Sequence, residues 1–482
     1  MNNHYKKSLV WFRRDLRLYD QAALFHALES SESVCCCFIF DANILHKLTN
    51  KEDRRVEFIW ESIRCLKEEL NALGSDILVR FGEPQKLIPQ LMHDLNCEAL
   101  FINKDYEDYA LTRDKEVALA LAKVNKKVHK YKDQVLFEEK EILTATGNPY
   151  TVFSPYRNNV LKKIEFEGIQ QFNCEKNKNR FAQTHTENLI SLEQLGFKQT
   201  NIQSLKIHFG TKGGILLIDD FKERLHQYKE KRDFPAIKGV SYLSVHNRFG
   251  TISVRHLAKL ALEKMSQGSA AWLNELIWRD FYFQILANFP HINHAKSFKT
   301  QFDAVRFENN EGFFNAWKNA ETGFPIIDAA MAQLNQTGFM HNRLRMVVAS
   351  FLVKDLLVDW RWGETYFAEK LIDYDFSANN GGWQWAASTG CDAQPWFRIF
   401  NPILQSEKFD AEGKFIKKYI PVLSELPKKE IHAPWVAYEK NPLTFQLRLG
   451  KDYPWPIVNH KEQREKALKM YDLKNVGQKL QL

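Results

Sequence analysis

The stretch TGFMHNRLRMVVASFLVKDLLVDWRW, residues 337–362, combines a helical core pattern with a basic and polar beginning. Its apolar residues recur at the spacing of one buried helical face: Leu344, Val347, Val348, Phe351 and Leu352. Its first turns also carry Arg343 and Arg345, and Asn342 and Met346 share a face where an amide and a thioether could line a pocket for a planar ligand. A buried helix with a solvated, charged start would explain the pattern as well.

The length and composition of the chain limit what this helix can belong to. With 482 residues, 44% of them hydrophobic, the chain is long enough for two or three domains. No apolar run reaches the ~18 residues of a membrane span, and the N-terminus MNNHYKKSLVWFRRDLRL lacks the apolar segment of a signal peptide. We therefore expect no membrane association and a cytoplasmic location.

The cysteines and the net charge are compatible with many partners. The seven cysteines form no C-x-x-C pair and no Cys/His pattern with metal-ligand spacing, so we expect reduced core cysteines and no metal site. The formal net charge of +8 is modest for this length. It permits a polyanionic partner but does not require one.

Residues 1–135 alternate short apolar runs with helical patterns. The runs are SLVWF, SVCCCFIF, DILVRFG, ALFIN and KVHKY, separated by segments such as RRVEFIWESIRCLKEELNALG. Strands joined by crossovers of this length predict a doubly wound parallel sheet, so we expect an α/β domain over 1–135. The chain has neither G-x-G-x-x-G nor G-x-x-x-x-G-K-[ST], and therefore no motif for a dinucleotide or a P-loop nucleotide.

The remainder of the chain changes character twice. Between about residues 170 and 207 it is rich in Asn, Lys, Gln and Thr with weak periodicity, and we expect an interdomain connector over 136–210. Helical periodicity dominates afterwards, which predicts a larger all-α domain over 211–482. Ten of the twelve tryptophans lie beyond residue 270, so most indoles belong to the helical part.

The segment WLNELIWRDFYFQIL, which begins at Trp272, predicts a helix with an aromatic and charged face. Helical spacing puts Trp272, Glu275 and Arg279 on one side, with Trp278 beside them. An ion pair between Glu275 and Arg279 over a tryptophan core would explain the pattern without any ligand.

The segment LIDYDFSANNGGWQWAASTGCDAQPWFRIFNP has amides directly before a glycine pair. Asn379 and Asn380 precede Gly381 and Gly382, which allow close approach of the backbone. Ordinary capping or core packing would explain its other prominent residues: Asp373, Asp375, Trp383 and Trp385. No Ser-His-Asp order, metal cluster or pair of glycosidase carboxylates can be argued from the spacings, so we expect any chemistry to come from a cofactor.

Four segments carry a resemblance to a known family. They are VWFRRDLRLYDQAAL, WLNELIWRDFY, TGFPIIDAAMAQLNQTGFMHNRLRMVVASFLVKDL, and ANNGGWQWAASTG followed by PWFRIFNP. Together they resemble the photolyase/cryptochrome flavoproteins, and most closely the class I cyclobutane pyrimidine dimer photolyases. The resemblance covers almost the whole chain. It implies an N-terminal α/β antenna domain and a C-terminal helical domain that holds FAD and binds DNA.

The resemblance also implies which residues contact the flavin. These are Tyr228, Val240, Ser241, Tyr242, Leu243, Ser244, Trp272, Arg279, Asn342, Arg345, Asp373, Asp375 and Asn379. Asn379 would lie by flavin N5, where a neutral amide can hydrogen-bond the protonated N5 of reduced flavin. An acid there would favour proton exchange, so the amide resembles photolyases more than plant or animal cryptochromes. The run VSYLS differs from the commonest family pattern, which matters little if its backbone amides bind phosphate.

The same resemblance implies a pocket for a damaged base pair. Glu275 would hydrogen-bond the pyrimidine dimer, Trp278 and Trp385 would form aromatic walls, and Asn342 and Met346 would also contact it. Relatives that repair 6-4 photoproducts carry a histidine pair where this chain has Asn342 and Met346, which favours dimer repair.

Two arginines resemble phosphate-contacting positions of the family. They are Arg232, in RDFP, and Arg398, in WFRIF. Surface solvation alone would also explain either side chain. If both contact DNA, binding should depend on salt and be largely indifferent to sequence outside the lesion.

The chain departs from its relatives at one end of a tryptophan series. Many relatives pass an electron to the flavin along three tryptophans, and Trp383 and Trp360 match the inner two. The outer position holds Phe307, which is much harder to oxidise. We hypothesise that Trp317 or Trp362 replaces it.

A second departure concerns the antenna chromophore. Tyr109 and Ala110 stand where folate-binding relatives carry an amide and a carboxylate. This weakens a methenyltetrahydrofolate site and leaves a deazaflavin, another flavin or no antenna.

The resemblance thus implies light-driven repair of cyclobutane pyrimidine dimers by electron transfer from photoexcited, reduced, anionic FAD to the flipped-out dimer. The residues implied in the reaction are Glu275, Met346, Trp360, Asn379 and Trp383. UV-damaged DNA would be the partner of a monomer without an obligate protein partner. The alternatives are a cryptochrome-type blue-light photoreceptor without repair activity and a nonenzymatic flavoprotein that binds DNA.

Overall fold

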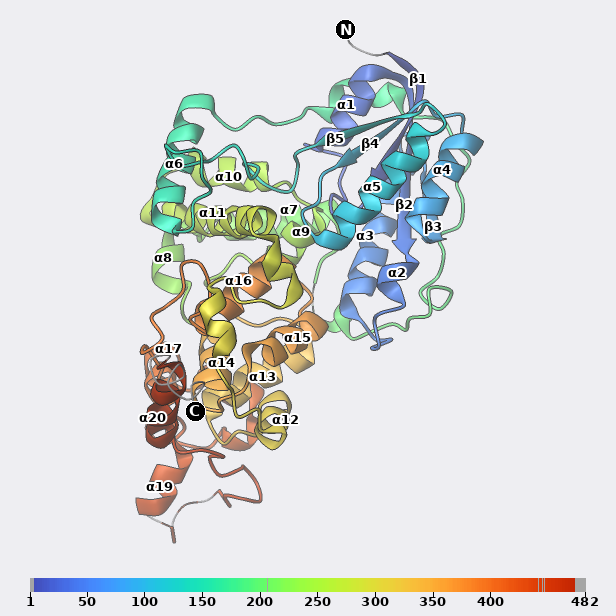
Figure 1. Cartoon of the computed structure of the whole chain (residues 1–482). Coiled ribbons are helices and arrows are strands. Elements are labelled where there is room, and N and C mark those ends of the chain that lie inside the picture. The colour runs from blue at the N-terminus through green and yellow to red at the C-terminus, as the bar shows by residue number, and fades with distance from the viewer. Residues whose placement is uncertain (1–3, 206, 441, 444, 446, 473–482) are drawn as a thin grey trace. The chain divides into compact units, whose positions relative to one another are not determined.

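Two compact units make up the chain. The computed structural model describes residues 4–472 except 206, 441, 444 and 446. The first unit comprises Met1–His226 and Ser241–Asn288, and the second comprises Gln227–Val240 and Phe289–Leu482 (Figure 1). The two units are defined by which residues of the chain contact one another. The domain boundaries expected near residues 135 and 210 stay a prediction.

A five-stranded parallel sheet organises the first unit. Its strands are β1 (Tyr5–Phe12), β2 (Ser31–Asp41), β3 (Ile77–Gly82), β4 (Ala99–Asn103) and β5 (Lys127–Tyr131). Their order is β3-β2-β1-β4-β5, and Leu9 pairs with Cys35 while Val10 pairs with Phe101. All five predicted runs are strands, and the predicted α/β fold with a parallel sheet is confirmed.

The crossover helices explain why β2 is an almost continuous apolar run. They are α1 (Ala22–Ser30), α2 (Ala42–Leu45), α3 (Arg54–Asn71), α4 (Pro84–Asp94) and α5 (Asp108–Ala122). Helices α4 and α5 lie side by side (Figure 1) and pack on a sheet face that includes Trp11, Cys35 and Cys37. Parallel strands covered by helices need apolar residues on both faces, and Cys36 on the opposite face is buried too.

The polar segment after α6 (Phe153–Glu167) packs against the rest of the first unit. The Ala182 backbone N–H donates to the carbonyl of Val34 at 2.9 Å, and the Trp60 indole N–H donates to the carbonyl of Ile190 at 2.7 Å. The large apolar side chains that it buries include Phe181, Leu192, Leu195, Phe197 and Ile202. Irregular backbone can therefore cover a core although its sequence lacks periodicity.

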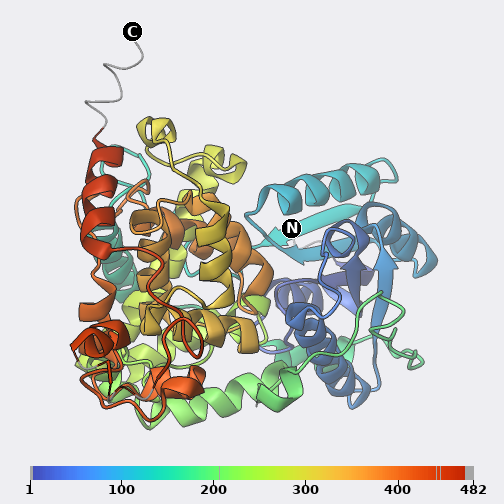
Figure 2. The same ribbon diagram turned by 90° about the horizontal axis from the view of Figure 1, so that it is seen from below.

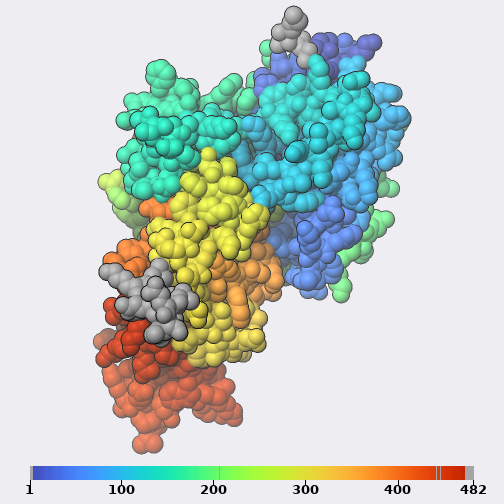
Figure 3. Space-filling view, viewed as in Figure 1, coloured from blue at the N-terminus to red at the C-terminus, as the bar shows by residue number. Residues whose placement is uncertain are grey.

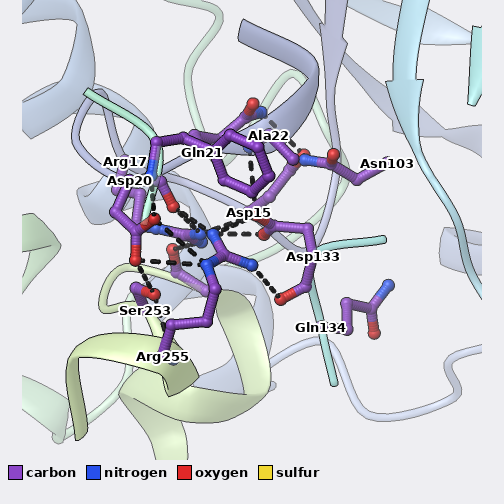
Figure 4. A network of polar contacts seen from close by, with 12 residues as sticks. Asp15, Arg17, Asp20, Gln21, Ala22, Asn103, Asp133, Gln134, Ser253 and Arg255 are labelled. Carbon is purple, nitrogen blue, oxygen red and sulfur yellow. Dashed lines mark hydrogen bonds and ion pairs between the residues drawn. The ribbon is translucent and has the colours of Figure 1, made fainter. Parts of the chain in front are cut away.

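A network of buried charges ties three parts of the first unit together (Figure 4). The carboxylate of Asp133 accepts hydrogen bonds from Arg17 and Arg255, each at 2.8 Å. Arg255 also reaches Asp20 at 3.1 Å, and Ser253 donates to Asp20. These residues come from the turn after β1, the segment after β5, and the start of α10 (Val254–Glu263). The network therefore fixes α10 against the loops at the sheet edge.

Three more helices complete the first unit. They are α7 (Gly210–Lys222), α9 (Ser244–Phe249) and α11 (Gln267–Asn288). Helix α11 carries the predicted face of Trp272, Glu275 and Arg279, and the prediction of a helix there is confirmed.

The described residues of the second unit form helices and no extended strand. In Figure 2 all arrows belong to the blue to cyan part of the chain, whereas the yellow to red part is helical. Its helices are α8 (Tyr228–Lys231), α12 (Glu311–Asn319), α13 (Pro325–Thr337), α14 (Asn342–Lys354), α15 (Trp360–Lys370), α16 (Phe376–Ala386), α17 (Pro402–Phe409), α18 (Lys414–Tyr419), α19 (Pro434–Lys440) and α20 (His460–Tyr471). The yellow segment that includes α12 lies at the surface in Figure 3.

The stretch 337–362 is the centre of the second unit's core. It becomes the end of α13, all of α14 and the start of α15. Val347, Val348 and Leu352 are buried in the main core cluster, as the helical pattern predicts. The helix ends at Lys354, and Leu357 adopts a positive φ of 53° in the turn before α15 begins. None of the helices described in either unit has both the length and the apolar character needed to cross a bilayer.

Candidate functional site

Helix α11 presents the aromatic and charged face predicted from its spacing. Trp272 is buried and contacts Phe221 edge-on, with ring centroids 5.0 Å apart. Glu275 and Arg279 are partly exposed. The guanidinium of Arg279 donates to the carbonyl of Gln134 and lies 4.7 Å from the Phe283 ring centroid. Arg279 is thus anchored at its tip, and its orientation is fixed.

Trp278 is one layer of an aromatic stack. Its ring lies parallel to that of Phe153 at a centroid distance of 3.6 Å and an interplanar angle of 7°. Tyr282 and Phe281 also contact it, at 5.5 Å each. The indole is only partly buried. A rigid indole with one covered face can offer its other face to a planar partner.

Asp280, next to this face, was not singled out in the sequence. Its carboxylate accepts the backbone N–H groups of Leu136 and Phe137, at 2.7 and 3.1 Å. Burial raises the pKa of Asp280 to about 7. An aspartate inside a helix gives no local signal that its partners are more than 140 residues away, so the sequence could not identify this contact.

The VSYLS run makes a sharp turn into α9. Tyr242 has a positive φ of 59°, and its ring lies 5.9 Å from the Arg224 guanidinium. The N–H of Leu243 donates to the hydroxyl of Ser241 at 3.4 Å, and Ser244 begins the helix. These residues lie in the first unit, whereas Val240 ends the segment that belongs to the second.

Helix α8 and the residue that caps its end carry two further predicted residues in the second unit. Tyr228 is buried at its start. The guanidinium of Arg232 lies 5.7 Å from the centroid of the Tyr228 ring. Just beyond, a Cβ on Gly239 would lie 2.3 Å from the carbonyl oxygen of Lys231, so only glycine permits this close backbone approach.

The basic start of α14 is held by acidic partners. Arg343 pairs with Asp233 at 2.9 Å, and Arg345 pairs with Asp373 at 2.8 Å. His341 caps the helix, and its Nδ1 accepts the N–H of Arg343 at 3.2 Å. Burial lowers the pKa of His341 to about 4, so the ring is neutral at pH 7 and can accept. Both arginines are therefore ion-paired, so the alternative of a helix with a merely solvated, charged start is wrong.

Asn342 and Met346 lie on that first part of α14. Asn342 is exposed, Met346 is partly buried, and Arg343 approaches the Met346 sulfur at 3.8 Å. The structure therefore leaves an amide and a thioether accessible on a helix whose backbone is fixed by two ion pairs.

The two predicted aspartates have different local partners. Asp373 pairs with Arg345, while Asp375 caps α16 by accepting the N–H of Ser377 at 3.1 Å and its hydroxyl at 2.6 Å. The capping explanation considered for Asp375 is therefore confirmed, and it does not exclude a second contact of the carboxylate.

The side chain of Asn379 has a defined orientation. Its amide nitrogen donates to the backbone carbonyl and to the Oε1 atom of Glu364, at 3.1 and 3.0 Å. Both donors face Glu364, and the amide oxygen has no hydrogen-bond partner among the described residues. Burial raises the pKa of the Glu364 carboxyl. Glu364 lies outside every motif read from the sequence, and only the fold brings it to Asn379.

Trp383 belongs to a buried aromatic cluster. Its ring contacts Trp317 at 6.1 Å and Phe367 at 5.0 Å, both edge-on. A Cβ on Gly363 would lie 2.1 Å from the Trp383 ring, so glycine is required beneath it. Trp317 is fully buried, and its indole N–H donates to the carbonyl of Val348 at 3.2 Å. Two oxidisable rings are thus in direct contact.

The other tryptophan positions are arranged differently. Trp360 is buried beneath the Arg361 guanidinium, which lies 4.7 Å from the ring centroid. Phe307 is partly buried and contacts Tyr471 at 6.5 Å. Trp362 is partly exposed and contacts Phe314, not Trp317, among the ring contacts of the described residues.

Trp385 and Arg398 occupy the end of α16 and the segment after it. Trp385 is partly exposed and contacts Phe400 at 6.4 Å. Arg398 is exposed, and its backbone N–H donates to the carbonyl of Pro395 at 3.0 Å.

Tyr109 and Ala110 lie at the start of α5 in the first unit. The Tyr109 hydroxyl donates to Asp41 at 2.7 Å, and burial raises the pKa of Tyr109 to about 12. Ala110 is buried. Arg113, one turn on, lies over the Trp11 ring at 4.9 Å. This corner of the sheet is therefore lined by a tyrosine, a tryptophan and an arginine.

Comparisons with known proteins match most of the chain. Residues 8–177 match a family model described as DNA photolyase, and residues 272–473 match one described as the FAD binding domain of DNA photolyase. The deoxyribodipyrimidine photo-lyase of Escherichia coli strain K12 is 37% identical over 479 residues, covering 97% of this chain and 99% of that protein.

Two solved structures extend the similarity to the fold. A class III photolyase from Agrobacterium tumefaciens has a TM-score of 0.88 at 32% identity, covering 99% of this chain and 98% of its own. An archaeal photolyase from Sulfolobus tokodaii with two FAD molecules has a TM-score of 0.80 at 33% identity, covering 96% and 99%. With two family models and full-length relatives in agreement, this chain belongs to the photolyase/cryptochrome family.

Proposed function

We propose that this protein is a deoxyribodipyrimidine photo-lyase, which uses light and reduced FAD to split cyclobutane pyrimidine dimers in DNA. The observation that carries the proposal is the orientation of Asn379. Because Glu364 takes both amide N–H donors, the oxygen is left to accept a hydrogen bond from a protonated ring nitrogen. Such an acceptor favours the reduced flavin that repair needs.

The residues of the second unit fit a flavin chemically. Arg345 supplies a fixed cation, Asp373 and Asp375 supply carboxylates for sugar hydroxyls, and Asn379 supplies an oriented amide. Tyr228, Val240 and Asn342 complete this proposed set.

A second proposed set of flavin contacts lies in the first unit. Trp272 supplies a buried indole, Arg279 an anchored guanidinium, and Ser241–Ser244 a turn with accessible polar groups. Backbone N–H groups and hydroxyls in such a turn suit phosphate oxygens.

The chain's own residues bind and orient the dimer. Reduced FAD, when bound, supplies light absorption and the electron that opens the cyclobutane ring. We assign Glu275 as a hydrogen-bond donor or acceptor to the dimer, Trp278 and Trp385 as aromatic walls, and Met346 as an apolar contact. Flipping the lesion costs a few kcal/mol, and stacking of about 1–3 kcal/mol per base can offset that cost. Asn342 adds an amide at the same end of α14.

Two arginines are assigned to the DNA backbone. Arg232 and Arg398 lie at partly exposed and exposed positions, which suits contact with phosphates. Each phosphate contact should add about one unit to the slope of log affinity against log salt.

Other expectations stay predictions. The Sulfolobus structure with two FAD molecules supports a second chromophore in this family. For this chain the alternatives are a deazaflavin, another flavin or no antenna, with methenyltetrahydrofolate disfavoured by Tyr109 and Ala110. A monomeric state and a cytoplasmic location are likewise predictions from the sequence.

The function is tested with the purified protein and its reduced flavin. A thymine-dimer oligonucleotide is added, the sample is illuminated with blue light, and recovery of thymine absorbance is followed against a dark control. We expect recovery only in the light. Tight binding of the lesion without recovery would instead identify a photoreceptor or a DNA-binding flavoprotein.

The path of photoreduction gives a separate prediction. Because Trp317 contacts Trp383 and Phe307 cannot be oxidised easily, Trp317→Phe should slow photoreduction of the oxidised flavin in the presence of a thiol. We expect about a tenfold loss of rate, a rise of about 1.4 kcal/mol in the barrier. Trp362→Phe is the matched control and should slow photoreduction less, since the ring of Trp362 contacts Phe314 among the described residues. Unchanged rates in both variants would reject this route.

A further inference from the structure

Lys354 is a fully buried lysine at the end of α14. Its ammonium donates to the hydroxyl of Ser388 and to the backbone carbonyl of Arg398, both at 3.0 Å. It also lies 5.8 Å from the centroid of the Tyr471 ring. Two of its three N–H donors therefore hold the segment Ser388–Phe400, one at its first residue and one at Arg398, near its end.

The segment Ser388–Phe400 begins in a conformation that needs support. Ser388 has a positive φ of 66° although it is not glycine, a geometry that costs of the order of 1 kcal/mol. The carbonyl of Thr389 accepts the N–H of Lys299 at 2.9 Å, and the N–H groups of Thr389 and Gly390 donate to the carbonyl of Gln384. The contact from Lys354 to Ser388 is the charged member of this set.

The C-terminal helix α20 braces the same place. The Tyr471 hydroxyl donates to the carbonyl of Ala387 at 2.8 Å, one residue before the segment. At the other end of α20, His460 hydrogen-bonds the buried carboxylate of Asp355, which follows Lys354. Helix α20 is thus fixed at both ends beside Lys354.

Burial of an ammonium costs free energy unless hydrogen bonds or an opposite charge offset its lost hydration. Burial lowers the pKa of Lys354 to about 7. A leucine or methionine at this position would avoid that cost. The two hydrogen bonds of Lys354 hold the side chain of Ser388 at the buried start of the segment and the backbone of Arg398 in its exposed part.

We propose that Lys354 is a positioning residue for DNA binding, which holds Ser388–Phe400 so that Arg398 meets a phosphate. This inference rests on the proposed function and on the assignment of Arg398. Lys354 itself touches neither DNA nor flavin, since its side chain is inside the second unit. Its effect should therefore pass entirely through Arg398.

The test is a double-mutant cycle on binding of a dimer-containing duplex in the dark, using the flavin-loaded full chain. Lys354→Met keeps the length of the side chain and removes its donors. We expect it to weaken binding by about tenfold in the native background and to reduce the salt slope by about one, the same effect that we expect of Arg398→Ala. In the Arg398→Ala background, Lys354→Met should have little further effect.

Three controls separate positioning from general damage. Val353→Ala, a buried truncation on the same helix, should leave binding unchanged in both backgrounds. The flavin absorption spectrum and the rate of dimer splitting with saturating DNA should also be unchanged in Lys354→Met. Equal weakening in both backgrounds, no weakening by Lys354→Met, or no effect of Arg398→Ala would each overturn the proposal. Failure of the native protein to repair dimers would instead reject the proposed function.

Discussion

Asn379→Asp should abolish most light-driven repair while leaving binding to damaged DNA in the dark intact. The amide nitrogen of Asn379 donates to the carbonyl and Oε1 of Glu364. Aspartate would place an acceptor oxygen against these two acceptors and a second carboxylate beside the partly buried carboxylate of Glu364. The side chain must then turn away or bind a proton, and in either case the oriented acceptor is lost.

We expect a loss in repair rate of about 100-fold or more, the effect of removing one oriented hydrogen-bonding group from an active site. The reduced flavin of the variant should also reoxidise faster in air, because the acceptor for its protonated nitrogen is gone. The measurements are the rate of thymine recovery under blue light and the decay of the reduced absorption spectrum.

Glu364→Gln is the matched control for Asn379→Asp. The glutamine retains an Oε1 acceptor for the Asn379 amide, and burial already favours the neutral form of Glu364. It should therefore keep most of the repair activity. Glu364→Leu removes that acceptor and should lose activity in the same direction as Asn379→Asp. Full repair by Asn379→Asp, or equal damage by Glu364→Gln, would contradict the assigned orientation.

Periodicity predicted the elements that carry the site. The five apolar runs are strands because parallel strands are buried on both faces and read as continuous apolar runs. The pattern of Leu344, Val347 and Leu352 is one face of α14, and the face of Trp272 and Arg279 lies on α11. These features depend on residues that are close together in the chain, so they can be read from the sequence.

The residues that orient the site could not be predicted in the same way. Glu364 meets Asn379, Asp280 meets Leu136, and Lys354 meets Arg398 across separations set by the fold. Each looks like an ordinary charged residue of a helix surface when read locally. Only burial reveals that each must have a specific partner, because an unpaired buried charge is too costly.

The polar segment between residues 170 and 207 shows a different limit of periodicity. Its composition gives no sign of a core, yet Phe181, Leu192 and Phe197 are buried within the first unit; the connector stays a prediction. Single apolar residues spaced irregularly along extended backbone carry no helical or strand period. Their burial follows from the surface beneath them.

Asp133→Leu should produce the largest loss of stability. Arg17 and Arg255 are buried, and each donates to Asp133 at 2.8 Å. Removing the carboxylate leaves two buried guanidiniums with one fewer charged partner. Breaking a buried ion pair from one side costs about 3–5 kcal/mol in the free energy of unfolding. Urea unfolding at pH 7, followed by far-UV circular dichroism, measures the loss.

The pH dependence of that loss has a definite sign. Burial alone would raise the pKa of Asp133, but the Arg17 and Arg255 guanidiniums hold it below its ordinary value of 3.8. The carboxylate therefore contributes stability above about pH 4, and the contribution is lost as the pH falls through the folded-state pKa. The gap between the native protein and Asp133→Leu should narrow below pH 4.

A compensating variant distinguishes an unpaired charge from a packing defect. Arg17→Met combined with Asp133→Leu removes both charges of one pair, while Arg255 keeps Asp20 at 3.1 Å. An apolar pair of similar volume can be as stable as a buried ion pair, so this double variant should regain most of the lost stability. If it is as unstable as Asp133→Leu alone, the cost lies in packing around the turn after β1. Recovery of stability in the double variant would show that Asp133 is needed because it neutralises the buried guanidinium of Arg17.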